Sequence, residues 1–133
     1  MPLEWDYTRM TTRIPEIDIE HKEWIRRYNE FDRAVTNGQG VAAIQATLDF
    51  LTEYAEAHFQ HEESVAAEVH SPVQALNHEN HDQYRAQLHE IRRWLAQEGA
   101  SVVEVVSLKQ DMEAWLLNHI CKVDTRILPV PEG

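Results

Sequence analysis

The stretch AHFQHEESVAAEVHSPVQALNHENHDQY, residues 57–84, decides the fold because one helix ends and the next begins inside it. It holds five of the chain's eight histidines, mixed with four glutamates. Ser71 and Pro72 mark the break, since a serine cap followed by proline in the first turn starts a helix. His58 and Glu62, before the break, are four residues apart and share one helix face. The stretch therefore predicts two helices that both carry metal-binding side chains.

Outside this stretch the apolar residues also recur at three- and four-residue steps, and no segment alternates like a strand. Short connections between four such helices indicate an all-α fold, an antiparallel up-down four-helix bundle. We expect a single domain over residues 1–133, with a non-helical N-terminal arm over 1–17, the bundle over 18–124 and a tail over 125–133. The expected helix starts are a cap at Asp18, Val41, a cap at Ser71 and a capping box at Ser101 and Glu104, and the expected ends are Gly38 and Gly99.

The composition describes an acidic globular domain. The formal net charge is −11 over 133 residues, and the sequence pI is near 5.1. This charge argues against nucleic acid or an anionic membrane surface as a partner. No run of about 18 apolar residues could cross a membrane. The single cysteine, Cys121, leaves no internal disulfide and fits a reducing cytosol, so we expect a cytoplasmic protein. We also expect a monomer.

Six side chains with metal-binding chemistry fall on the four expected helices. Imidazoles and carboxylates that project inward from all four helices of a bundle suit a pair of iron or manganese ions. The carboxylates then bridge the ions and the imidazoles fill the remaining positions. Two carboxylates buried without a cation would each cost several kcal/mol, at order of magnitude. The candidate metal ligands are His21, His58, Glu62, His81, His119 and Asp124.

These candidates stand in segments that resemble the hemerythrin family, and specifically its single-domain bacterial members, over nearly the whole chain. The matching segments are EWDYTRMTTRIPEIDIEHKEW, HFQHEE, SPVQALNHENHDQY and WLLNHICKVD. The resemblance implies seven side chains that hold a non-haem di-iron centre, which binds dioxygen reversibly. The implied terminal ligands are His21 and His58 on the iron that takes dioxygen and His81 and His119 on the other iron, with Glu62 and Asp124 as bridges.

The seventh ligand is where this chain departs from the family pattern. That pattern has histidine four residues before the position of His81, and this chain has Asn77. Pro72 and Tyr84 flank the motif in the family's register. Three interpretations stay open: Asn77 with water or a weak amide contact, His78 as the ligand through a slip or together with His81, and a site with one metal or mixed metals. Because an amide oxygen binds Fe(II) more weakly than imidazole, the second iron is expected to be held less tightly.

Other residues near these motifs have simpler interpretations. A lone histidine on a helix is usually a surface or satisfied core residue, which suits His61. Glu63 is expected to face solvent or a neighbouring helix. Trp24 and Trp115 can be plain core residues or apolar walls of the metal site. Trp24 stands one turn after the first-helix histidine, where the family usually has a smaller aliphatic residue.

The leading functional interpretation is an oxygen-binding protein with two iron ions as cofactor and dioxygen as ligand, hence a carrier, store or sensor. The main alternative is a di-iron enzyme that acts on peroxide or nitric oxide through an open position left by Asn77. A third interpretation is an iron-handling protein.

Overall fold

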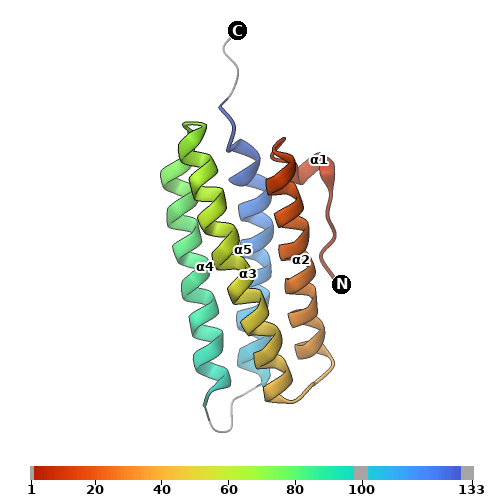
Figure 1. The fold of residues 1–133 in the computed structure, drawn as a ribbon. Coiled ribbons are helices and arrows are strands. Elements are labelled where there is room, and N and C mark those ends of the chain that lie inside the picture. Colours follow the sequence, from red (N-terminus) through yellow and green to blue (C-terminus); the bar gives the residue numbers. More distant parts are fainter. Residues whose placement is uncertain (1, 98–101, 130–133) are drawn as a thin grey trace.

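The computed structural model describes residues 2–97 and 102–129, and four long helices of that part of the chain form an elongated bundle (Figure 1). Successive helices run in opposite directions and pack against each other, and α2 also packs against α5. The described residues contain no strand, so the expected all-α up-down bundle is confirmed. The long helices are α2 (Pro15–Thr36), α3 (Val41–Glu68), α4 (Gln74–Leu95) and α5 (Val102–Lys122).

The core is the apolar face that each long helix turns inward. These faces pack into one main cluster, and a second, smaller cluster lies where Ile17 of α2, Val65 of α3 and the segments beside α4 and η1 meet. Burial of such side chains is the dominant favourable term in folding. Among the largest fully buried side chains are Trp24 and Phe31 from α2, Leu48 and Phe59 from α3, Tyr84 and Ile91 from α4, and Met112 and Leu116 from α5.

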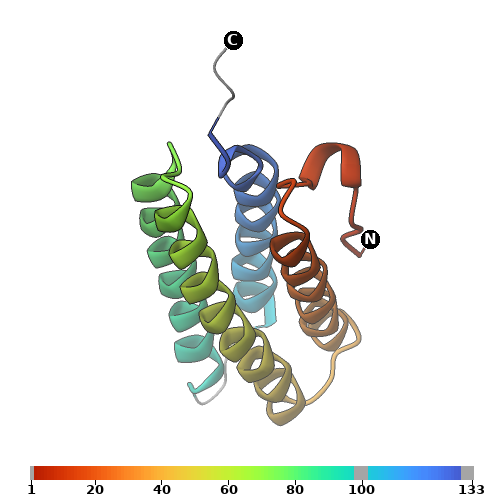
Figure 2. The ribbon, with the colours of Figure 1, turned by 45° about the horizontal axis from the view of Figure 1, so that its top comes forward.

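The N-terminal arm is not wholly non-helical, because Tyr7–Met10 form the short helix α1, capped by the side chain of Asp6. Figure 2 shows α1 on the outside of the bundle, near the start of α2, and α1 contacts α5. The expected cap at Asp18 is wrong, since α2 begins at Pro15, where proline's missing N–H costs nothing. The Asp18 carboxylate instead accepts from the Thr12 backbone N–H at 2.8 Å and from two threonine hydroxyls, which ties the arm to α2.

Of the other helix limits, two match the expectation and one differs by a few residues. The start of α3 at Val41 and the end of α2 before Gly38, which has φ +63°, are as expected. Ser71 precedes α4 by three residues, and its Oγ accepts from the Val73 N–H at 3.2 Å. The expected capping box at Ser101 and the helix end at Gly99 lie outside the described residues.

The chain after α5 is more ordered than a tail. Asp124–Arg126 form the 3-10 turn η1, and Ile127 is fully buried against the bundle. The expected tail from residue 125 therefore begins too early. None of the described helices is long and apolar enough to span a membrane.

Candidate metal centre

The antiparallel order brings all six candidate ligands together in one half of the bundle, toward the helix ends that lie at the top of Figure 1. The start of α2, the end of α3, the start of α4 and the end of α5 meet there, followed directly by η1. Each of the six side chains is buried, with at most 2% of its surface exposed. They are His21 from α2, His58 and Glu62 from α3, His81 from α4, His119 from α5 and Asp124 from η1.

Four of these side chains form a first group. Nε2 of His21 lies 2.9 Å from Glu62 Oε2 and 3.1 Å from Asp124 Oδ2. Nε2 of His58 lies 2.9 Å from the same Glu62 oxygen. The possible ligand atoms of the four residues all lie within 4.8 Å of one another, so they could hold one metal ion.

A second group lies on the other side of the same two carboxylates. Nε2 of His81 lies 3.1 Å from Glu62 Oε1, and Nε2 of His119 lies 2.9 Å from Asp124 Oδ1. These residues also satisfy the 4.8 Å spacing for one metal ion. Glu62 and Asp124 thus each turn one oxygen toward each group, which is the arrangement of carboxylates that bridge two cations. Which ions the six side chains bind stays a prediction.

Several buried atoms of this cluster lack the hydrogen bonds that buried polar atoms normally make. Nε2 of His58, Nε2 of His119 and Oδ2 of Asp124 lie close to oppositely charged atoms but in poor hydrogen-bond geometry, and Oδ1 of Asn77 has no hydrogen-bond partner among the residues that the structure describes. Atoms of these types are imidazole nitrogens and oxygens, the ligands that iron, manganese and zinc take in proteins. The residues present therefore fit metal ions.

In the absence of an ion, protons balance the carboxylates. Burial lowers the pKa of His21, but hydrogen bonds and charges from Asp124 and Glu62 outweigh it and raise that pKa to about 10. Burial also acts against His119, and the same two carboxylates raise its pKa to about 9. The pKa of Glu62 is lowered well below its usual value, because the nearby imidazoles outweigh its burial. The cluster is thus a set of buried ion pairs whose protons a metal cation can replace.

Comparison with known families now identifies the bundle. A family model described as the hemerythrin HHE cation binding domain matches residues 12–130. The chain belongs to the hemerythrin family. The resemblance stated from the sequence is therefore confirmed.

Solved structures agree with this family fold. Three of them superpose with a TM-score of 0.81, each over 94% of this chain and 94% of its own, at 23% sequence identity. One is a wild-type hemerythrin, one is a leucine-to-tyrosine hemerythrin mutant, and one is described as a leucine-to-phenylalanine mutant. No curated protein matches the chain.

Two further glutamates hold the imidazoles of this hemerythrin-family site from outside. Glu20 Oε1 lies 2.7 Å from Nδ1 of His58, and Glu63 Oε2 lies 3.0 Å from Nδ1 of His81. A carboxylate that accepts from Nδ1–H orients the ring and leaves Nε2 free for a metal. The same hydrogen bonds lower the pKa of both glutamates against the opposing effect of burial, so both stay ionised.

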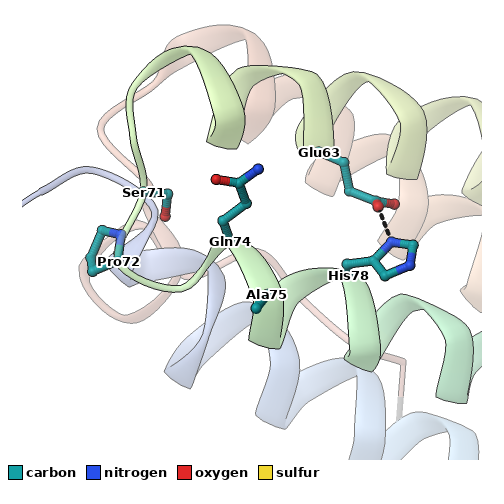
Figure 3. Close-up of a pocket in the computed structure, with 6 residues that line it drawn as sticks. All are labelled: Glu63, Ser71, Pro72, Gln74, Ala75 and His78. Atoms are coloured by element: carbon teal, nitrogen blue, oxygen red, sulfur yellow. Dashed lines mark hydrogen bonds and ion pairs between the residues drawn. The ribbon is translucent and has the colours of Figure 1, made fainter.

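Each outer glutamate also bonds a histidine nearer the surface. Glu20 Oε2 lies 2.5 Å from Nδ1 of His61. Glu63 forms a short contact with His78 in the wall of a surface pocket (Figure 3). His61, expected to be a surface residue, is indeed partly exposed, but its glutamate partner links it to the site.

Asn77 lies inside the cluster, beside the two shared carboxylates. Its side chain is fully buried, and its Nδ2 donates to Glu62 Oε1 at 2.9 Å and to Asp124 Oδ1 at 3.1 Å. His78 is instead 60% exposed and points toward Glu63 (Figure 3). The interpretation in which His78 supplies the seventh group therefore does not fit this structure, because a helix turns adjacent residues to different faces.

Aromatic rings cover the imidazoles on the core side. The ring of Phe59 stacks on His81 with centroids 4.0 Å apart, and Trp115 stacks on His119 at 4.6 Å. Trp24 lies 5.2 Å from His58 and is fully buried. Both interpretations of Trp24 therefore hold, since it is a core residue and a wall of the cluster.

Sequence spacing did not reveal the roles of Glu20 and Glu63. Each is adjacent in sequence to a candidate ligand, Glu20 to His21 and Glu63 to Glu62. Neighbours on one helix do not face the same way, so the contacts are made across to another helix, from Glu20 to His58 and from Glu63 to His81. The sequence shows only that each glutamate stands next to a candidate ligand. Which histidine each glutamate bonds depends on how the helices pack.

Proposed function

We propose that this hemerythrin-family chain holds two iron ions in its two overlapping groups and binds dioxygen reversibly at the pair. The observation that carries the proposal is that Glu62 and Asp124 each turn one oxygen to each group. Ferrous ions bound as such a pair supply dioxygen with one electron each.

Charge balance favours two divalent ions. The site contains two buried carboxylates, Glu62 and Asp124, and two outer carboxylates, Glu20 and Glu63. These four negative charges match the four positive charges of two divalent cations, provided that the ligating imidazoles are neutral. The outer glutamates support this state, because each accepts from the Nδ1–H of an imidazole whose Nε2 faces the site.

The chain also supports reversible binding by keeping water away from the proposed metal site. Trp24, Phe59 and Trp115 pack on the imidazoles, and the first two are fully buried. Such a dry wall limits the access of water and protons, which would otherwise drive irreversible oxidation of the centre. A reversible carrier needs this protection.

The test is an iron count together with absorption spectra of the reduced protein through repeated cycles of oxygenation and deoxygenation. We expect two irons per chain at saturation and spectra that return to the reduced form. Glu62→Ala should bind no iron pair, whereas Glu53→Ala, an exposed residue of the same helix, should behave as the parent. Absence of iron, or complete oxidation in the first cycle, would refute the proposal.

A second candidate function is an enzyme that acts on peroxide or nitric oxide, and Asn77 is the observation that favours it. The Asn77 side chain occupies the place of an imidazole, and its Nδ2–H donates into the second group. An amide there leaves the second metal position with one fewer imidazole, and so with room for an added ligand. If this function holds, the reduced protein should consume peroxide or nitric oxide catalytically, and Asn77→His should slow that turnover.

Dioxygen is the only partner that we propose for the site. The cytoplasmic location and the monomeric state expected from the sequence stay predictions. Light scattering of the iron-loaded protein would measure the second of these directly.

A further inference from the structure

One aromatic side chain links the site to the outer surface of the bundle. Trp115 is half-buried on α5, and its ring stacks on the His119 ring with an interplanar angle of 10°. Its Nε1 donates to Oε1 of the exposed Gln83 at 3.2 Å. Trp115 therefore contacts the second group of candidate ligands on one side and the solvent-exposed edge of α4 on the other.

The first group reaches the same tryptophan through two buried rings. Trp24 lies 5.2 Å from His58 and 6.1 Å from His21, measured between ring centroids. The ring of Tyr84 lies 5.1 Å from Trp24 and 4.9 Å from Trp115. These separations are those of aromatic rings in direct contact. Trp24 and Trp115 are also 6.3 Å apart directly, so the rings form a continuous cluster from Trp24 to Trp115 with Tyr84 against both.

We propose that Trp24, Tyr84 and Trp115 form a path that carries oxidising equivalents from the metal centre to the surface of the protein. The inference rests on the proposed function, because it requires a metal centre that meets an oxidant. Its role is protection. A reductant in solution supplies the electron that an unwanted oxidation removes, so no ligand imidazole is oxidised. Both groups of ligands are connected to Trp115 through ring contacts. Trp115 is therefore the residue at which the oxidising equivalent reaches the surface.

Hydrogen peroxide is the oxidant that we consider. Its reduction to two waters takes two protons from solvent and two electrons from the protein. Where the centre supplies only one electron, Trp24 supplies the other and becomes a radical cation. Trp115 then returns an electron to Trp24. The resulting Trp115 radical cation releases its indole proton to water, and a thiol restores the residue by giving one electron and one proton. The weaker second metal position at Asn77 favours such partly loaded centres.

The charge rests on the tryptophans and not on Tyr84. A phenol must lose its proton when it loses an electron, and burial raises the pKa of Tyr84. The Tyr84 hydroxyl accepts from Trp24 Nε1 at 3.2 Å, and no described residue accepts its proton. Tyr84 therefore serves as a bridging ring that also holds the Trp24 indole in place.

The experiment treats the reduced protein, loaded with only one ferrous ion per chain so that centres can supply a single electron, with less than one equivalent of peroxide in the absence of thiol. Electron paramagnetic resonance of frozen samples detects the radical, and peptide mass spectrometry after exposure to air locates oxygenated tryptophan. We expect a tryptophanyl radical and oxygenation at Trp115, with little at Trp5 or Trp94, and loss of both on addition of thiol. In Trp115→Phe, oxygenation should shift inward to Trp24, and each dose of peroxide should release more iron.

Controls separate this path from general damage. Trp94→Phe, on the same helix as Tyr84 but outside the ring cluster, should behave as the parent. Tyr84→Phe keeps the ring and should retain oxygenation at Trp115. Tyr84→Leu leaves only the direct 6.3 Å approach of Trp24 to Trp115 and should shift part of the oxygenation to Trp24. Circular dichroism checks that each variant folds. Equal oxygenation of all tryptophans, or no inward shift in Trp115→Phe, would overturn the inference. Reversible oxygenation is measured on the same preparation after full loading with iron. A protein that binds no iron refutes the proposed function and the path, whereas a reversible carrier whose partly loaded form shows no oxidation at Trp115 refutes the path alone.

Discussion

Asn77 Nδ2 donates a 2.9 Å hydrogen bond to Glu62 Oε1, the oxygen of the shared carboxylate that faces the second group of imidazoles. Both side chains are fully buried. An amide in this place can satisfy the carboxylates in the metal-free protein, but it replaces an imidazole that would otherwise ligate the second ion. The two proposed metal positions are therefore unequal in their protein ligands.

Asn77→His is expected to strengthen the second position. The new imidazole would project from the face of α4 that carries His81, one turn away, and imidazole is a better ligand for Fe(II) than an amide oxygen. We expect slower loss of iron to a chelator and slower autoxidation than in the parent protein, both measured by stopped-flow or manual mixing absorption.

His78→Ala is the matched comparison on the same helix. Because His78 is exposed and contacts Glu63 outside the cluster, its removal should change chelator-driven iron loss far less than a ligand substitution would. If His78→Ala strips the iron while Asn77→His has no effect, His78 is the seventh ligand and the placement of Asn77 is wrong in the loaded protein.

Glu62→Ala should abolish the metal pair, since both groups lose the same shared carboxylate. It should also destabilise the metal-free protein by about 3–5 kcal/mol, because removal of one partner leaves buried protonated imidazoles unpaired. Iron analysis and urea unfolding of the metal-free variant measure the two effects. Glu53→Ala is the control on α3, and a Glu62→Ala protein that kept its iron and its free energy of unfolding would contradict the assignment.

The six candidate ligands could be chosen from the sequence because each motif is local to one helix and their order resembles that of hemerythrins. The structure brings these six side chains together, and their binding of metal stays a prediction. The register of Asn77 was also readable, but the choice between Asn77 and His78 was not, because it depends on which side of α4 faces Glu62. The prediction of a helix cap at Asp18 was wrong for a different reason. Asp18 has the chemistry of a cap, but its hydrogen bonds to Thr11 and Thr12 depend on where the N-terminal arm packs, which the sequence pattern does not show.

The outer glutamates provide a test of how the imidazoles are held. Glu20→Gln and Glu63→Gln keep the size of the side chain but remove the charge that orients His58 and His81 through Nδ1. Loss of such an outer carboxylate typically lowers metal affinity about 10–100-fold. We expect a decrease in this range in competitive titrations with a chelator. Glu53→Gln is the control, and unchanged affinity in both outer variants would show that these contacts are only structural.

The stability of the metal-free protein should depend on pH through its buried imidazoles. The pKa of His21 is raised from 6.5 to about 10, and that of His119 from 6.5 to about 9. A raised pKa means that the folded state binds the proton more tightly than the unfolded state. The stabilisation is therefore fully present below pH 6.5 and is lost as the pH rises through 9 and 10.

Metal loading should reverse this dependence. Ligating imidazoles must be neutral, so ions displace the protons of His21 and His119, and metal affinity rises with pH. We expect proton release on anaerobic loading with ferrous ions, detected by an indicator dye in weak buffer at neutral pH. The difference in Tm between the loaded and metal-free proteins should widen from pH 6 to pH 9, the upper end being where the pKa of His119 lies. Glu62→Ala, which should not load, gives the baseline for non-specific release. Parallel pH profiles of the two forms would show that the ions bind elsewhere, since ions outside this cluster would leave its protons in place.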